Sequence, residues 1–244
     1  MDGDLKGAAS VVIKVGTSSL MAADGVSLDM RVMEALVEDI VGLMSQGKKI
    51  VLVTSGAVGL GKINKGEVVQ GRDVQVAARV GQPKLMNEYI RLFEKWGRQV
   101  GQLLLTNEEF REEKVGDKVV RPIEEDFKGG VLTIINENDA ITDKQTTMGD
   151  NDWLAAKVAV AIKADRLVML SVNRESAGGK GGSDAKEKAM EHAEENGITT
   201  LLVDGKRPHI IRDTCNGDSS GRQNARAFLE AARDRRRTAV KAKA

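Results

Sequence analysis

The chain has 244 residues, of which 41% are hydrophobic and only 3% aromatic, and its formal net charge of +1 argues against binding nucleic acid through bulk electrostatics. Its single cysteine excludes a disulfide and a thiolate metal cluster, and its two histidines lie in polar segments, so we predict no protein-built metal site. No apolar stretch reaches the length of a membrane span and the N-terminus lacks a signal-peptide core, so we expect a cytoplasmic protein without a membrane partner.

Short apolar runs alternate along the chain with amphipathic helical patterns. This alternation is typical of right-handed βαβ units, which build a mostly parallel sheet with helices on both faces. We therefore predict an α/β fold, a three-layer αβα sandwich with a mostly parallel central sheet. The predicted strands are Val11–Val15, Ile50–Thr54, Val100–Leu105, Val131–Ile135, Leu167–Ser171 and Thr200–Val203.

Helices are predicted between these strands from apolar residues at helical spacing. The first has Ser27 as its N-cap and Gly47 as its stop, and later ones cover residues 82–96, the segment from Asn151 onward and residues 183–196. The charged segment 106–129 is expected to be an irregular surface excursion. Residues 222–244 carry six arginines and two lysines, and we predict a terminal helix ending in disorder.

Three glycine-rich turns adjoin predicted strands and helices, around Gly16, around Gly56 and at residues 178–182. Glycine lets backbone amides approach a phosphate closely, although tight packing alone also selects it. The P-loop pattern is missing from the sequence. Lys14 stands inside an apolar strand, where an unpaired ammonium is costly, so it should reach a ligand or a carboxylate at the strand's end. Lys186 is expected in the first turn of a helix.

Two polar clusters stand where the chain should leave the sheet. Residues 136–139 read Asn-Glu-Asn-Asp after an apolar run, and residues 149–152 read Gly-Asp-Asn-Asp before a helix. Such residues commonly form turns and helix N-caps, and Asp150 is a predicted cap. Ligands of open α/β sheets bind at the carboxyl ends of the strands. Carboxylates and carboxamides there can also hold the ammonium and carboxylate groups of a small zwitterion.

Several of these segments resemble the signatures of the glutamate 5-kinases, within the amino acid kinase family. The resemblance runs in order from about residue 10 to residue 170. Its segments are Val11–Ser18, Val53–Val58, Gly81–Met86, Gln102–Thr106, Ile135–Ala140 and Gly149–Asp152.

The resemblance implies an enzyme that transfers the γ-phosphoryl group of ATP, with Mg²⁺, to the side-chain carboxylate of L-glutamate. The product would be γ-glutamyl phosphate, the first intermediate of proline biosynthesis. Proline as a feedback inhibitor and a homo-oligomer, dimeric or tetrameric, are also implied. It implies a kinase domain over residues 8–222, with a glutamate-binding lobe to about 165 and a nucleotide-binding lobe after it, and a basic tail over 223–244.

The family pattern also assigns roles to residues of this chain. The implied catalytic residues are Lys14 and Lys186, which would contact the phosphoryl group, and Asp152, which would hold both lysines in position. The implied glutamate-binding residues are Ser55, Gly56, Ala57, Asp139, Asp150 and Asn151. The implied nucleotide-binding residues are Lys14, Gly16, Ser171, Val172, Lys180, Gly181, Gly182 and Lys186.

After residue 170 the chain departs from this pattern. The family's Gly-Thr-Gly-Gly-Met-x-Thr-Lys turn is replaced by residues 179–186, which read Gly-Lys-Gly-Gly-Ser-Asp-Ala-Lys, and the loop before it is shortened. The C-terminal PUA-type domain of many members is expected to be missing. Two alternatives stay open. One is a non-catalytic glutamate- or proline-binding regulatory homologue, and the other is a kinase acting on a different small acid.

Overall fold

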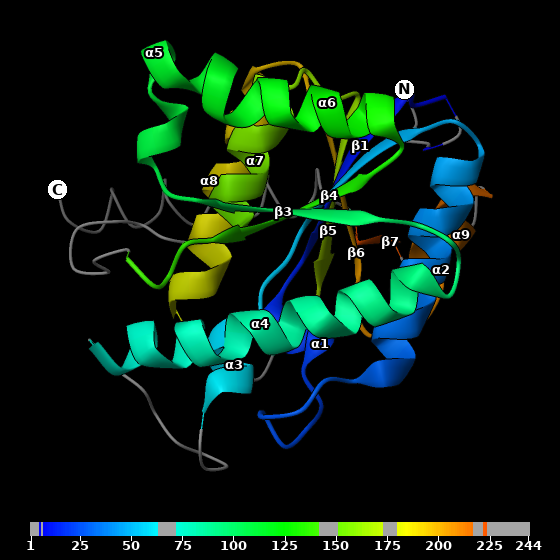
Figure 1. Cartoon of the computed structure of the whole chain (residues 1–244). Helices are drawn as coiled ribbons and strands as arrows, with labels where there is room; N and C mark the ends of the chain where they lie inside the picture. Colours follow the sequence, from blue (N-terminus) through cyan, green and yellow to red (C-terminus); the bar gives the residue numbers. More distant parts are fainter. Residues whose placement is uncertain are drawn as a thin grey trace, which may run out of the picture.

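The structure is a computed structural model of the whole chain (Figure 1), and it describes Leu5 and residues 7–62, 72–141, 151–172, 180–216 and 222–223. The described residues form a seven-stranded sheet in the order β3-β4-β2-β1-β5-β6-β7. All pairings in it are parallel except that of β7 with β6. The strands are β1 (Ser10–Val15), β2 (Lys49–Val53), β3 (Val100–Leu105), β4 (Leu132–Glu137), β5 (Arg166–Ser171), β6 (Thr199–Asp204) and β7 (Arg222–Gln223).

Helices cover both faces of the sheet, so the predicted three-layer α/β sandwich is confirmed (Figure 1). One face packs against α1 (Thr17–Leu20), α2 (Met30–Ser45), α3 (Ala57–Gly61), α4 (Arg72–Glu94) and α9 (Ile210–Cys215). The other packs against η2 (Gly116–Val120), α6 (Arg121–Gly129), α7 (Asn151–Ala161) and α8 (Lys180–Glu195). Two short helices, η1 (Glu108–Phe110) and α5 (Glu112–Val115), lead from β3 to η2.

Strand alternation decides which face each side chain of β1 joins. Val11, Ile13 and Val15 belong to the core under α2 and α4, and Val12 belongs to the core under α7 and α8. Lys14 is two residues from Val12, so it lies on the α7 side. The sequence therefore directs the one charged residue in the middle of β1 toward the first turn of α7.

The six predicted strands are confirmed to within two residues, but several predicted helical features are wrong. Helix α2 is capped by Asp29, whose Oδ1 accepts from Val32 N at 3.4 Å, whereas the Ser27 hydroxyl bonds to Asp24. Helix α4 begins at Arg72 rather than residue 82 and continues through Pro83. Proline and glycine in the middle of this helix imitate the signals of a helix start.

The segment 106–129 is not merely a surface excursion, because it contributes η2 and α6 to the second core. Val119 and Ile123 are fully buried there, each at 0% exposure. The predicted C-terminal helix is also wrong at its beginning, since residues 222–223 form a strand against β6. Residues 224–244 lie outside the described part of the chain.

Helices α3 and α4 approach each other so closely that two glycines are required. A Cβ on Gly61 would come within 1.8 Å of Ala77 O, and a Cβ on Gly81 within 1.7 Å of Ala57 O. Both obstacles are backbone atoms, which cannot turn aside as a side chain does. The turn that begins α3 is thus held against the middle of α4.

The Gly81→Ala variant should unfold more easily than the wild type. Alanine favours a helix by up to about 1 kcal/mol, but forcing α3 away from α4 should cost more, leaving a net loss of about 2 kcal/mol. Gly42→Ala in α2 is the matched control, because no atom outside its own helix lies within 4 Å of a Cβ there. Urea unfolding should give the two variants opposite signs, and a stabilised Gly81→Ala would contradict the packing argument.

Candidate active site

Polar residues gather where the parallel strands β1, β2, β4 and β5 end. Because these strands are parallel and adjacent in the sheet, their carboxyl ends lie at one edge. The residues that follow are the Gly16 turn, the segment from Thr54 to Ala57, the segment from Glu137 to Asp139, and Ser171 with Val172. This edge is where ligands of open α/β sheets bind.

A buried carboxylate joins two lysines from different elements at this edge. The Nζ atom of Lys14, on β1, lies 2.5 Å from Asp152 Oδ1, and the Nζ atom of Lys186, on α8, lies 2.7 Å from Asp152 Oδ2. The Lys14 and Asp152 side chains are each 5% exposed and that of Lys186 is 12% exposed. The two ammonium groups bring positive charge to this edge of the sheet, which suits an anionic ligand.

The protonation state of Asp152 follows from its surroundings. Burial by itself would raise the pKa of this carboxyl, but the ammonium groups of Lys14 and then Lys186 outweigh burial and hold the pKa below its ordinary value of 3.8. Asp152 also stands in the first turn of α7, where the helix dipole favours a negative charge. It is therefore ionised at neutral pH and can orient both lysines.

Gly16 leaves room for this cluster. A Cβ on Gly16 would lie 3.3 Å from Lys14 Nζ, so a larger residue would crowd the ammonium group. Gly16 is also the N-cap of α1, and its carbonyl accepts from the Ser19 and Leu20 amides. The backbone of this turn therefore lies directly beside the charged end of Lys14.

The turn after β2 is held by a buried tyrosine that the sequence analysis missed. Gly56 has φ +109, a left-handed conformation that favours glycine, and it leads into α3. Thr54, just before it, shares a 2.8 Å hydrogen bond between its Oγ1 and the hydroxyl of Tyr89 on α4. Tyr89 is fully buried, and burial raises the pKa of its hydroxyl, so it stays protonated. Only the folded packing brings Tyr89 to this turn.

The segment after β4 connects the cluster to a cavity. Glu137 N donates to Asn151 Oδ1 at 3.1 Å, which ties the end of β4 to the residue before Asp152. Glu137 and Asp139 are buried, at 9% and 8% exposure. They line a cavity of about 320 Å³ between this segment and α4. The cavity is lined by Ala57, Ala78, Arg79, Gln82, Pro83, Gln102, Leu104, Glu137, Asn138, Asp139 and Ala140.

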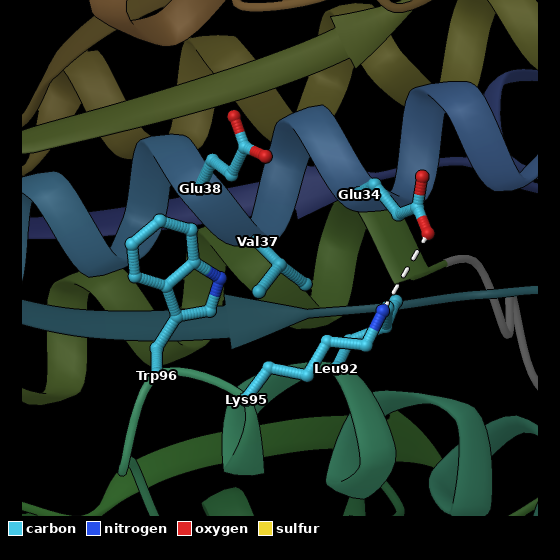
Figure 2. A pocket seen from close by; sticks show the side chains of 6 residues that line it. All are labelled: Glu34, Val37, Glu38, Leu92, Lys95 and Trp96. Atoms are coloured by element: carbon cyan, nitrogen blue, oxygen red, sulfur yellow. Dashed lines mark ion pairs between the residues drawn. The ribbon is translucent and has the colours of Figure 1, made fainter.

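A second hollow, of about 360 Å³, lies between α2 and the end of α4 (Figure 2). Val37 and Leu92 form its apolar part, and Trp96 stands half-exposed beside it. Lys95 Nζ lies 3.9 Å from Glu34 Oε1 across its rim. None of the predicted site residues lines this hollow, so the candidate active site is the edge with the 320 Å³ cavity.

Most of the predicted site residues meet at this edge, and several do not have the expected structure. Lys180, Gly181 and Gly182 were expected in a turn before a helix at residue 183, but their backbone already belongs to α8, which begins at Lys180. Lys186 consequently lies beyond the first turn of that helix. Asp150 lies outside the described residues. Ser171 and Val172 follow β5, and Ser171 O accepts from Gly205 N at 3.0 Å.

Within the ranges described, no group of three or more His, Cys, Asp or Glu side chains is placed to hold a metal ion. Among the helices of those same ranges, none combines the length and the apolar character that a membrane crossing requires.

The sequence matches the profile of the amino acid kinase family over residues 9–172. The glutamate 5-kinase of Ligilactobacillus salivarius is 33% identical, in an alignment that covers 89% of this chain and 96% of that protein. The glutamate 5-kinase of Symbiobacterium thermophilum is 35% identical over 86% and 94%. That of Clostridium acetobutylicum is 36% identical over 86% and 92%.

The first of these alignments spans 258 residues while using 89% of a 244-residue chain. The relative therefore has residues inside the aligned region that this chain lacks. A shortened loop after residue 170, as predicted from the sequence, is consistent with this difference in length.

Solved structures with the same fold are much more distant in sequence. An isopentenyl phosphate kinase superposes with a TM-score of 0.60 at 11% identity, covering 87% of this chain and 98% of that one. The UMP kinase of Ureaplasma parvum superposes with a TM-score of 0.55 at 14% identity, covering 85% and 94%. At these identities the likeness establishes the fold alone.

Proposed function

The chain belongs to the amino acid kinase family, and on that premise we propose that it phosphorylates the side-chain carboxylate of L-glutamate with ATP. The observation that carries the proposal is the buried cluster of Lys14, Asp152 and Lys186 beside a cavity with carboxylate and amide walls. The cluster suits the phosphates of a nucleotide, and the cavity suits a small zwitterion. The relatives are named glutamate 5-kinases, and we therefore propose glutamate as that zwitterion.

The reaction needs alignment and charge neutralisation more than covalent help from the protein. An oxygen of the glutamate γ-carboxylate attacks the γ-phosphorus of ATP and forms a new O–P bond. The bond from that phosphorus to the bridging β,γ-oxygen breaks, and ADP leaves with the electron pair. No general base is needed, because the γ-carboxylate is already ionised at pH 7. The products are γ-glutamyl phosphate and ADP.

The proposed roles follow from position and charge. Lys14 would neutralise the phosphoryl oxygens from the β1 side, and Lys186 would do so from the nucleotide side. Asp152 would fix both ammonium groups so that they need not reorganise as charge develops. Backbone and hydroxyl donors around the phosphoryl group and the γ-carboxylate would come from Gly16, Ser55, Gly56 and Ala57.

The remaining proposed contacts divide between the two substrates. Asp139, Asn151 and Asp150 would bind glutamate, with a carboxylate for its ammonium group. Nucleotide contacts would come from Ser171, Val172, Lys180, Gly181 and Gly182. Mg²⁺ would arrive with ATP and would neutralise part of the charge of its phosphates.

A non-catalytic glutamate-binding homologue is the alternative from another class. Such a protein has no use for two buried lysines held on one carboxylate at a strand end. Inhibition by proline and a homo-oligomeric state stay predictions, which the assay below with added proline and sedimentation of the protein would test.

The proposal predicts ADP formation that depends on L-glutamate and on Mg²⁺. With hydroxylamine present, the acyl phosphate should be trapped as γ-glutamyl hydroxamate. A panel of amino acids in the same coupled assay tests the substrate. Faster turnover with aspartate would overturn the assignment to glutamate, and no turnover with any small acid would favour the binding homologue.

We further predict weak selection of the nucleotide base. The loop before α8 is short in sequence, and phosphate contacts are common to every nucleoside triphosphate. Base discrimination needs buried polar groups that the wrong base leaves unpaired, and little sequence is available to supply them. We expect a high KM for ATP and a preference over GTP within roughly tenfold, about 1.4 kcal/mol. Competition between ATP and GTP decides this, and a hundredfold preference for ATP would contradict it.

A further inference from the structure

We propose that Gln82 on α4 is a substrate-binding residue whose side-chain NH₂ group donates a hydrogen bond to the α-carboxylate of glutamate. Arg79, one turn earlier on the same helix, supplies positive charge to the same carboxylate. Both residues line the 320 Å³ cavity. The inference rests on the proposed function, and it adds two residues that the family-derived assignment of the site does not contain.

A chain of hydrogen bonds fixes which way the Gln82 amide points. The backbone N–H of Glu137 donates to Asn136 Oδ1 at 2.9 Å, so the oxygen of the Asn136 amide faces that donor. The Nδ2 group of Asn136 must then point the other way, and it donates to Gln82 Oε1 at 2.8 Å. Because its oxygen is turned toward Asn136, Gln82 directs its Nε2 group away from Asn136.

That Nε2 group is buried, and no acceptor for it is found among the described residues. A buried donor without an acceptor is costly, and native proteins rarely retain one without a reason. Asn136 is itself only 2% exposed, so the surrounding core holds its amide in this orientation. The two amides therefore cannot flip together to give the Gln82 donor an acceptor. Gln82 is also one of the residues that line the cavity, so we assign the missing acceptor to an oxygen of the ligand bound there.

The two walls of the cavity differ in charge in the way a zwitterion requires. The wall after β4 presents Glu137 and Asp139, which suit an ammonium group. The wall from α4 contains Gln82 and Arg79, whose amide donor and guanidinium group suit a carboxylate. Ala57 lines the cavity next to the Gly56 turn, which is the proposed place of the γ-carboxylate. Glutamate can therefore span the cavity with its α-carbon end held between the walls.

The test compares L-glutamate with 4-aminobutyrate, which is glutamate without its α-carboxylate. Gln82→Met removes the donor at similar volume, and Gln82→Glu removes it while keeping an oxygen for Asn136. Both variants should lower kcat/KM for glutamate by about tenfold to a hundredfold, mainly through KM, and leave 4-aminobutyrate unchanged. Gln46→Met is the control, because Gln46 is an exposed glutamine at the C-cap of α2, outside the lining of this cavity, and its replacement should alter kcat/KM for neither compound.

The outcomes separate this inference from the proposed function. A wild-type protein that neither phosphorylates glutamate nor binds it in a calorimetric titration overturns both. Suppose that the wild type acts on glutamate. If the ratio of kcat/KM for glutamate to kcat/KM for 4-aminobutyrate is then unchanged in both Gln82 variants, the inference alone is overturned. An equal loss for glutamate and 4-aminobutyrate also overturns it, because Gln82 would then only support the fold. If glutamate binds without turnover, the same comparison is made on the titrated affinities.

Discussion

The Lys14→Ala variant is expected to lower kcat for glutamate phosphorylation by about a hundredfold or more, the scale for removing one preorganised charge stabiliser. The lysines are positioned to match the geometry in which the transition state spreads negative charge over the phosphoryl oxygens, so the loss should appear in kcat more than in the glutamate KM. The free energy of unfolding should change less, because Asp152 keeps Lys186 as a partner at 2.7 Å. Lys186→Ala should behave similarly from the nucleotide side.

Lys157→Ala provides the matched control for both variants. Lys157 is a partly buried lysine on α7, the helix that carries Asp152, but its Nζ donates to Asn107 at 2.8 Å, away from the cluster. Its removal should leave kcat within about twofold of the wild type. A Lys14→Ala enzyme with wild-type kcat would show that the phosphoryl group is neutralised elsewhere. The double variant Lys14→Ala/Lys186→Ala should lose less than the two single losses multiplied, because the lysines act as one unit.

The strands and the position of Lys14 were predictable because local pattern decides them. Apolar runs separated by amphipathic helices admit few arrangements other than a parallel sheet, and alternation along β1 sets the face of each side chain. The expectation that Lys14 would reach a carboxylate is confirmed by its 2.5 Å distance to Asp152. A buried lysine requires such a partner, whichever element supplies it.

Features that depend on packing were not predictable in this way. Tyr89 meets Thr54 across 35 positions of sequence, and Gln82 meets Asn136 across 54. No local pattern marks these pairs, since Tyr89 reads as an ordinary apolar position of a helix. The beginning of α4 was missed for the opposite reason. Gly81 and Pro83 locally disfavour a helix interior, yet α4 runs through both of them and packs closely against α3 at Gly81.

Asp29 rather than Ser27 caps α2, and this too depends on a contact between segments that are distant in the sequence. The carboxylate of Asp29 also accepts from Lys206 Nζ at 3.1 Å, and that ammonium donates to Met21 O at 2.8 Å. The start of α2 is therefore tied to the loop after β6. Lys206 is distant from Asp29 in the sequence, so the local pattern around the helix start does not reveal this partner.

The Asp152→Asn variant is expected to lose both activity and stability, because it keeps the size of the side chain and removes the carboxylate charge that contacts both lysines. Removing one partner of a buried ion pair typically costs about 3 to 5 kcal/mol, since the remaining charge stays buried and uncompensated. Here two ammonium groups would be left together, so we expect a loss at the upper end of that range. The lysines would move apart toward solvent, and kcat should fall by at least about a hundredfold.

The pH dependence of the stability loss distinguishes the contribution of the Asp152 charge from that of the side-chain shape. The pKa of Asp152 is held below 3.8 in the folded state, so its ionisation stabilises the fold above that value, and the contribution is lost as the pH falls through the lowered pKa. The difference in unfolding free energy between wild type and Asp152→Asn should stay constant from pH 7 to about pH 4. At lower pH it should shrink, because a protonated Asp152 resembles asparagine. Urea unfolding measures the difference, and one that does not shrink at any acidic pH at which the wild type stays folded would mean that Asp152 acts by packing and hydrogen bonding.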